Sequence, residues 1–512
     1  MIFQLETCRR WIYQNRLLMF LLAVCITRLW LMPLPSSFWT DETGTAFVVQ
    51  RPADPSLTVV SQVPASIYYA FPHMAGRLFG FSEISYRVPS LLLMGIALFI
   101  IGRLAARLID PGAAWFAVFA CLAISDFNFY AIDARPYALG ICVAAASLWF
   151  LIEWLDTGSW IPALFFVFFA ALLWRVQLVF WAFYPVFAIY TLVRLVCSTT
   201  ARSATVRSTT KVGWLRACLV YCLLALALIP VAFEALAILR TAKAHVIASV
   251  PGIRSFLQAP GWWWIALAAL APVFARFLKW RVQRPVTLSA ITLICAWWLW
   301  MPLCLFVYSR LTTTVLFISR YYSPTLPGVA LAVTAATALY LPRVRWKQAS
   351  AVIAVLGLIA AGEWNALWPD HFPDTWREAS LEEDFAAQEP DTPVITVSPF
   401  IEAQPPTWSP EYRLPGFLYA PVFVYPLRGR IYPFPFMRSE VAERYAAGLL
   451  RDTLVKRARF IVYGAGRDTQ SWVRWFSQRP ELANWRYVAG GAKAIDVAVF
   501  ENPGSAGEAT LH

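Results

Sequence analysis

The sequence predicts a polytopic α-helical membrane protein with about eleven transmembrane helices, followed by a C-terminal extracytoplasmic α/β domain. Three observations support this prediction: the composition, the spacing of apolar runs, and an uneven distribution of charge. Of the 512 residues, 59% are hydrophobic and only 14% are charged, whereas soluble domains average about 45–50% apolar and about 25% charged residues. This composition excludes a soluble globular protein and, for the same reason, a disordered chain.

Eleven apolar runs approach the roughly 20 residues that one membrane crossing requires. The first run follows a basic stretch, as in a signal peptide, but lacks a small-residue cleavage site, so we expect it to be retained. The fifth and sixth runs are the hardest to separate, because the apolar segment from Trp160 to Val196 can be divided in more than one place. The expected spans are 13–33, 86–106, 113–131, 136–154, 160–174, 177–196, 216–239, 262–279, 287–308, 324–341 and 348–364.

The positions of the basic residues predict the orientation, because Lys and Arg are enriched in cytoplasmic loops. With a cytoplasmic N-terminus, four of the five inner loops are basic, and only the loop with Glu153 and Asp156 breaks the pattern. The basic loops carry Arg103 and Arg107; Arg194, Arg202, Arg207, Lys211 and Arg216; Arg276, Lys279, Arg281 and Arg284; and Arg343, Arg345 and Lys347. An odd number of spans then places the end of the chain outside. The membrane that we expect is a bacterial inner (plasma) membrane.

The end of the chain differs from the rest in charge. Residues 365–512 contain 15 Lys and Arg against 18 Asp and Glu, whereas residues 1–364 contain 28 against 12. We therefore predict two domains, a transmembrane domain at 1–364 that includes the outer loop 35–83, and an extracytoplasmic domain at 365–512. All nine cysteines lie before residue 310, so the second domain has none with which to form a disulfide.

Alternating short segments predict an α/β fold for the second domain. Thr375-Trp-Arg-Glu378 is typical of a capping box, which would open a helix that runs to about Gln388. The other expected elements are a helix at Ser439–Lys456 and strands at Val394–Ser398, Arg459–Tyr463 and Asp496–Phe500.

The outer loop after the first span begins with two adjacent carboxylates, Asp41 and Glu42. Neighbouring side chains in a helix or strand point in different directions, so one carboxylate can face a cavity while the other anchors the loop. A carboxylate in a cleft at the membrane surface can act as a general base. The alternative is that both are solvated loop charges or that they cap a nearby helix.

A second polar group lies at the outer junction of spans three and four. Here Asp133 and Arg135 are expected to pair, and Pro136 suits the first turn of the next helix, which begins near Tyr137. Charged residues near a bilayer usually face protein or a water-filled cavity. Arg135 and Tyr137 are therefore candidate site residues, and an ion-paired helix junction is the alternative.

Further cations lie at the outer ends of later spans. Arg320, with Tyr321 beside it, lies at headgroup depth, where a guanidinium can bind a phosphate through two hydrogen bonds. The alternative for Arg320 is an interfacial anchor whose charged end reaches toward water. Arg175 and Lys243 are additional candidates in outer loops.

Together these segments resemble the GT-C superfamily of membrane glycosyltransferases. The most similar branch is family 39, which contains the protein O-mannosyltransferases and the lipid A aminoarabinose transferase. The similarity covers the whole chain and depends on the order of several short motifs. These are Trp39-Thr-Asp-Glu42, Gln62-Val-Pro-Ala-Ser-Ile-Tyr-Tyr69, Arg77-Leu-Phe-Gly-Phe-Ser-Glu83, Arg87-Val-Pro-Ser90, Asp133-Ala-Arg-Pro-Tyr137, Arg320-Tyr-Tyr322 and Trp376-Arg377.

The resemblance implies transfer of a sugar from a polyprenyl-phosphate-linked donor to a glycan, lipid or protein acceptor on the extracytoplasmic side. Asp41 matches the catalytic acidic position of the family, with Glu42 as its partner. Some relatives have an arginine soon after this pair that contacts the donor phosphate, but Gly44 and Thr45 follow here. We therefore expect the donor to be bound by other residues: Arg320, Tyr321, Arg135, Tyr137, Arg175 and Lys243.

Two other classes stay open, a transporter or flippase of lipid-linked glycans and an enzyme like the O-antigen ligases or polymerases. Transporters usually show internal repeats, and the sequence has none. Nucleic-acid binding is excluded because the basic residues lie in short loops between apolar runs. We assign no cofactor and no metal ligands, and leave a divalent cation as an open alternative, because the four histidines are scattered: His73, His245, His371 and His512.

Overall fold

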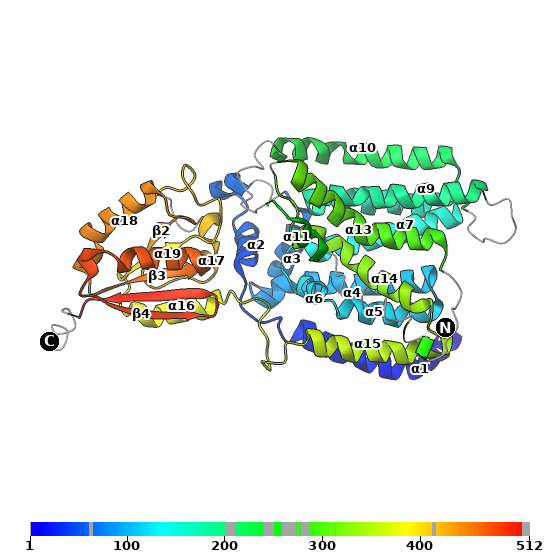
Figure 1. The fold of residues 1–512 in the computed structure, drawn as a ribbon, viewed down its shortest axis with the longest axis horizontal. Helices are drawn as coiled ribbons and strands as arrows, with labels where there is room; N and C mark the ends of the chain where they lie inside the picture. The colour runs from blue at the N-terminus through cyan, green and yellow to red at the C-terminus, as the bar shows by residue number, and fades with distance from the viewer. Residues whose placement is uncertain are drawn as a thin grey trace.

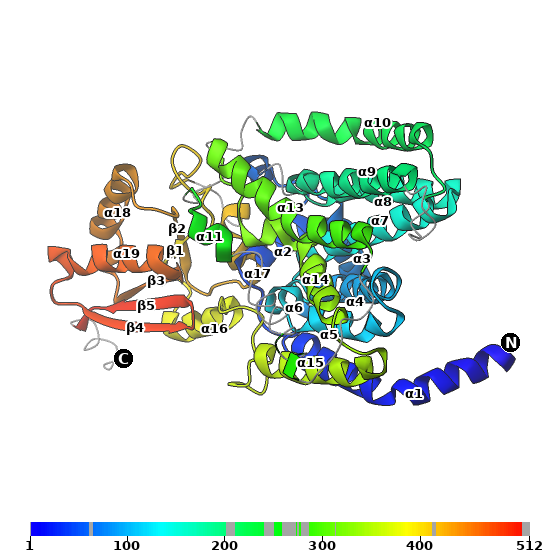
Figure 2. The ribbon, with the colours of Figure 1, turned by 45° about the vertical axis from the view of Figure 1, so that its right-hand side comes forward.

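The structure, a computed structural model, describes residues 2–60, 65–200, 210–239, 250–258, 273, 276–277, 286–312, 314–411 and 416–503. It has two parts, a bundle of long helices and a smaller α/β domain at the C-terminal end (Figure 1). Helix α2, Thr40–Gln50, lies between the two parts and belongs to the segment 35–83, which was predicted to be the first outer loop. The view in Figure 2 shows the same arrangement, with the start of α1 projecting from the bundle.

The bundle consists of apolar helices that lie roughly side by side (Figure 1). Among the described residues, seven helical segments are long and apolar enough to cross a membrane. Every predicted span coincides with helix except 262–279, most of which lies outside the described residues. The helices are α1 (Ile2–Ile26), α4 (Glu83–Leu108), α5 (Ala114–Leu122), α6 (Ser125–Ala131), α7 (Tyr137–Thr157), α8 (Trp160–Val176), α9 (Tyr184–Thr200), α10 (Trp214–Leu239), α13 (Leu288–Leu311), α14 (Leu326–Ala338) and α15 (Trp346–Ala361).

The predicted third span, 113–131, is not one straight helix, so the prediction of a single continuous span there is wrong. Helices α5 and α6 meet at an angle of 82°, because Ile124 adopts an extended conformation between them. The side-chain amide of Asn128 donates to the carbonyl oxygens of Leu122 and Ile124. These bonds satisfy backbone groups that the break would otherwise leave unpaired in an apolar environment.

The acidic residues that broke the expected charge pattern are paired. Arg107 lies 2.5 Å from Glu153 and 2.7 Å from Asp156, and Asp156 also lies 2.6 Å from Arg194. Both acids lie in the last turns of α7, and their charges are neutralised by arginines of α4 and α9.

The C-terminal domain is a mixed five-stranded sheet in the order β2-β1-β3-β5-β4. Strands β2, β1 and β3 are parallel, and β5 runs antiparallel to both β3 and β4. Strand β1 is buried along its whole length because helices pack on both faces of the sheet (Figure 1). The strands are β1 (Pro393–Val397), β2 (Arg430–Phe434), β3 (Arg459–Ala465), β4 (Arg486–Ala492) and β5 (Ile495–Glu501); the main helices are α16 (Trp376–Ala387), α18 (Glu440–Asp452) and α19 (Gly466–Ser477).

The first helix of this domain was predicted correctly, but its capping box was not. Helix α16 begins at Trp376 as expected, yet the Thr375 side chain makes no capping hydrogen bond. Its hydroxyl instead donates to the carbonyl oxygen of Ala492 at 2.7 Å. The three predicted strands and the helix near Ser439 are present, whereas β2 and β4 were missed.

The C-terminal domain packs directly on α2. Helix α17, Ala420–Val424, lies against α2 (Figures 1 and 2), and the rings of Phe417 and Phe423 meet Phe47 at 6.0 and 5.1 Å between centroids. The Tyr425 hydroxyl accepts a hydrogen bond from the backbone N–H of Phe38 at 2.9 Å. The helix that carries the acidic pair is therefore held between the bundle and the sheet domain.

Candidate functional site

Glu42 is an anchor of the outer loop. Its carboxylate is fully buried and accepts two hydrogen bonds from Arg87, at 2.8 Å from Nε and 2.5 Å from Nη2. It also accepts from the backbone N–H of Trp39, which precedes α2, at 3.3 Å, and from that of Ala134 at 2.8 Å. Such bonding of a carboxylate to the start of its own helix satisfies a backbone donor that has no intrahelical partner.

Arg87 completes this anchor. Arg87 belongs to α4, and its side chain is fully buried. Its guanidinium also donates to the carbonyl oxygens of Leu34, Ser36 and Ser37, at 2.7 to 3.0 Å. These carbonyls belong to the segment that leads from the first span to α2. The buried pair therefore fixes the segment between the first span and α2 against α4.

Asp41 points toward a different set of groups. Its Oδ2 lies 2.6 Å from Nη1 of Arg320 and 3.8 Å from Nη2 of Arg135. Arg135 also contacts the carbonyl oxygen of Asp41 and the hydroxyls of Thr45 and Tyr69, at 3.3 to 3.5 Å. The Asp41 side chain is 19% exposed, so this carboxylate, unlike Glu42, is accessible. Two guanidinium groups from distant segments thus converge on one accessible carboxylate.

Tyr137 and Tyr321 belong to the same cluster. The buried side chain of Tyr137 lies close enough to Arg320, Arg135 and Asp41 to interact with them electrostatically. The guanidinium of Arg320 lies 5.7 Å from the centroid of the Tyr321 ring. Aromatic rings at this distance favour a cation. The structure therefore brings six predicted site residues to adjacent positions: Asp41, Glu42, Arg135, Tyr137, Arg320 and Tyr321.

The expected pairing of Asp133 with Arg135 is wrong. The chain around Asp133 is not helical, and the two side chains point to different partners. Arg135 faces Asp41, as described above, whereas Oδ1 of Asp133 accepts a hydrogen bond from Nε1 of Trp39 at 3.1 Å. Burial raises the pKa of Asp133 to about 7. Within the described part of the chain, no ion pair joins Asp133 to an arginine.

Of the remaining two candidate cations, only Arg175 lies among the described residues. Arg175 is half-buried at the end of α8, and no ion pair forms there among the residues that the structure describes. Lys243 lies outside the described residues. Both stay predictions from the sequence.

A polar cavity of about 620 Å³ lies beside the segment that carries Arg320, Ser319–Thr325. Its chemistry suits a sugar, because carboxylate, amide and hydroxyl groups stand next to aromatic rings. The polar and aromatic lining residues are Asp126, Ser255, Gln258, Phe317, Ser319 and Tyr322.

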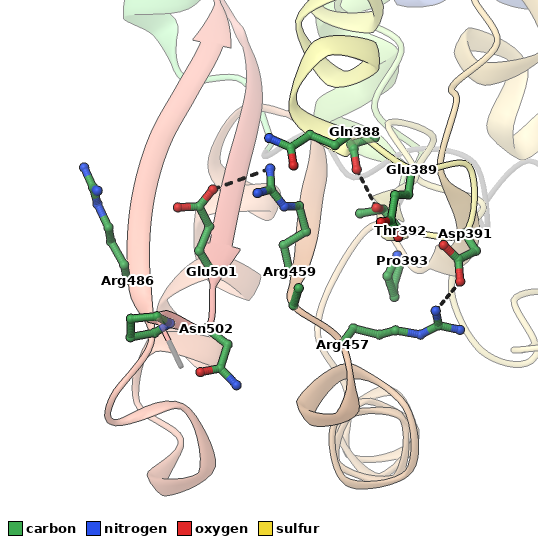
Figure 3. A pocket seen from close by; sticks show the side chains of 13 residues that line it. Gln388, Glu389, Asp391, Thr392, Pro393, Arg457, Arg459, Arg486, Glu501 and Asn502 are labelled. Carbon is green, nitrogen blue, oxygen red and sulfur yellow. Dashed lines mark hydrogen bonds and ion pairs between the residues drawn. The ribbon is translucent and has the colours of Figure 1, made fainter. Parts of the chain in front are cut away.

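A second cavity, of about 350 Å³, lies in the sheet domain (Figure 3). Two of its three arginines are paired: Arg457 with Asp391, and Arg459 with Glu501 at 3.6 Å. Because the third, Arg486, shares the lining with three carboxylates, those of Glu389, Asp391 and Glu501, we assign no anionic ligand to this cavity.

Sequence reasoning gave no role to several residues that build the site. Arg87 appeared only as part of a motif, and His371 was one of four scattered histidines. In the structure the His371 imidazole is buried, and burial lowers its pKa to about 3. Asp374 accepts a 2.6 Å hydrogen bond from the hydroxyl of Thr40 at the start of α2. Only the three-dimensional contacts reveal these roles.

The arrangement of the long-helix bundle, α2 and the terminal α/β domain is similar to that of two solved structures: ArnT from Cupriavidus metallidurans bound to undecaprenyl phosphate, and the same protein in the apo state. Each has a TM-score of 0.54 and 12% sequence identity, and covers 94% of this chain. The matches span 98% and 97% of those chains. No protein-family model matches the chain, and no curated protein matches it.

Proposed function

We propose that this protein is a glycosyltransferase that moves a sugar from a polyprenyl-phosphate-linked donor to an acceptor on the extracytoplasmic side of the membrane. One observation carries the proposal: Arg320 and Arg135 converge on the accessible carboxylate of Asp41. The reaction needs cationic groups that bind the donor phosphate next to a carboxylate that takes up the acceptor proton. The undecaprenyl phosphate bound to a protein of the same fold supports the donor class.

In the proposed reaction, an acceptor hydroxyl oxygen attacks the anomeric carbon from the face opposite the phosphate. The bond between that carbon and the phosphate oxygen breaks, its electron pair leaves with the polyprenyl phosphate, and the configuration is inverted. Asp41 takes the acceptor proton as general base. The guanidinium groups of Arg320 and Arg135 stabilise the charge that develops on the phosphate.

The ion pair between Asp41 and Arg320 gives the donor a second role. In the structure, Oδ2 of Asp41 is occupied by Nη1 of Arg320 at 2.6 Å. A donor phosphate competes for the same guanidinium, since Arg binds phosphate through two hydrogen bonds. Donor binding would therefore release Asp41 to act as base, and the polar cavity beside Ser319 would accept the sugar.

Transfer by the purified protein in liposomes tests this function. We expect the polyprenyl-phosphate-linked sugar that co-purifies with the protein, identified by mass spectrometry, to be consumed with formation of polyprenyl phosphate and a glycosylated acceptor. A protein that moves intact lipid-linked glycan across the bilayer and leaves the sugar–phosphate bond unbroken would be a flippase instead.

The side of the membrane is tested by reporter fusions. We expect a periplasmic reporter such as alkaline phosphatase to be active when it is fused after Glu363, because the predicted inner loops are basic. The matched control is a fusion after Leu108, in a predicted inner loop, where only a cytoplasmic reporter should be active. The reverse result at Glu363 would place the site on the cytoplasmic side.

Phosphate binding is tested at Arg320. Arg320→Ala is expected to lower kcat/KM for the donor by roughly 10²-fold, the size typical for loss of one preorganised charge stabiliser. Arg320→Lys should retain more activity, because lysine keeps the charge but loses the two-pronged geometry. Arg310→Ala, an exposed arginine at the end of α13, is the control. Normal turnover and donor binding by Arg320→Ala would reduce Arg320 to an interfacial anchor.

A further inference from the structure

Three potential metal ligands from distant parts of the chain meet in the interior beside Asp41. They are Glu42 at the start of α2, Asp133 between α6 and α7, and His371 in the segment between α15 and α16. One ligand atom from each lies within 4.8 Å of the other two, and all three residues are buried.

Two of these three residues present polar atoms that have no partner. Oδ2 of Asp133 and Nε2 of His371 are both buried and make no hydrogen bond with any residue that the structure describes. The two side chains are 0% and 1% exposed, so solvent does not reach them. A buried polar atom without a partner costs free energy that a native structure rarely leaves uncompensated.

A hydrogen bond between the two side chains does not explain the arrangement. Nε2 of His371 lies 3.9 Å from Oδ1 of Asp133, which is too far for a hydrogen bond. A metal ion satisfies both atoms at once, because it accepts an anionic oxygen and a neutral imidazole nitrogen as ligands. We propose that Glu42, Asp133 and His371 bind one divalent transition-metal ion of the Zn²⁺ type.

The dimensions and the charge fit such an ion. Zn²⁺ bonds of about 2.0–2.2 Å place neighbouring ligand atoms about 3–3.5 Å apart, so the three groups need to close by roughly an ångström. Two carboxylates contribute two negative charges, of which Arg87 balances one. A mixed nitrogen and oxygen set with few ligands suits Zn²⁺ better than Ca²⁺ or Mg²⁺, which need six or more oxygens including water.

The ligands are already held in position by outer contacts, as is usual for metal sites. The His371 ring stacks on Phe129 at 4.3 Å between centroids, and its backbone N–H donates to the Ser36 hydroxyl at 3.0 Å. Trp39 holds the second oxygen of Asp133. Both carboxylate oxygens of Glu42 accept hydrogen bonds from Arg87 and from the backbone N–H groups of Trp39 and Ala134, so the ion would take the place of one of these donors.

The ion would join three segments that carry the site. It would connect α2, next to Asp41, to the α6–α7 junction that carries Arg135, and to the segment that leads into the sheet domain. Its role is structural, because the accessible Asp41 is not among its ligands.

Metal content of the full-length protein in detergent tests this site. After removal of bound metal with a chelator, incubation with Zn²⁺ and desalting, we expect about one Zn²⁺ per chain by mass spectrometry of the elements. His371→Ala should bind Zn²⁺ at least roughly 10–100-fold more weakly, since even an outer-shell contact is worth that much. The control is His73→Ala, an exposed histidine on α3, Ala70–Phe79, which should bind like the wild type.

A second measurement keeps the proposal testable if His371→Ala folds poorly. Zn²⁺ should raise the thermal unfolding midpoint of the wild type and of His73→Ala, because a ligand that binds only the folded state stabilises it, and should leave His371→Gln unchanged. Co²⁺ in place of Zn²⁺ should give a visible absorption band that Asp133→Asn loses. Absence of bound Zn²⁺ in the wild type, or equal Zn²⁺ binding by His371→Ala, would overturn the proposal.

Discussion

Asp41→Asn is expected to lower the rate of sugar transfer by roughly 10²–10⁴-fold, the usual contribution of a general base. Asparagine keeps the size of the side chain and its place at the start of α2, but it does not take up the acceptor proton. The variant should still fold, because Glu42 and not Asp41 makes the bonds that anchor the loop. The measurement is kcat with saturating donor, in the liposome assay.

Asp54→Asn provides the matched control for Asp41. Asp54 lies in the same outer loop, where its carboxylate accepts hydrogen bonds from Ser56, so its loss should leave kcat near the wild-type value. Asp41→Asn also removes the charge that Arg320 faces, so donor binding should change less than kcat does. Near-normal kcat in Asp41→Asn would mean that another group is the base.

Arg87→Met is expected to destabilise the protein by about 3–5 kcal/mol, because it leaves the buried charge of Glu42 without its partner. It also removes hydrogen bonds to the carbonyls of Leu34, Ser36 and Ser37. The measurement is the unfolding midpoint in detergent with a chelator present, so that no metal ion compensates the carboxylate.

A double variant separates charge from packing at this pair. Arg87→Met together with Glu42→Gln should be less destabilised than Arg87→Met alone, since it no longer buries a lone charge. Arg77→Ala, an exposed arginine on α3, should unfold like the wild type. If the double variant is as unstable as the sum of its single variants, the charge of the pair is not what stabilises the loop.

The positions of the helices were predictable because the thickness of a bilayer sets the length of an apolar run. The break between α5 and α6 was not, since neither Gly nor Pro marks it and the compensating bonds of Asn128 are visible only in three dimensions. The strands β2 and β4 were missed because both lie at the edges of the sheet. Pro433 interrupts the pattern of β2, and β4 is exposed on both faces.

For the site, the sequence and its resemblance to a known family indicated the candidate residues but not the residues that they contact. Asp41 and Arg320 were both named, yet their contact joins positions 279 residues apart, which no local pattern encodes. Arg135 was expected to pair with its near neighbour Asp133, but in the structure Arg135 faces Asp41 and Asp133 accepts from Trp39. The contribution of His371 depends on where the last span ends and the sheet domain begins, which is a property of the whole fold.

The contacts of α2 also determine when the site forms during synthesis. Helix α2 emerges early, but the carboxylate of Asp374 that receives the Thr40 hydroxyl follows 334 residues later. At about 5–20 residues per second, the ribosome needs roughly 20–70 s to make that stretch. The newly made helix can therefore meet Arg87 and Ala134 early, but it waits for Arg320 and Asp374 until those later segments are made, and a shorter chain has no assembled site.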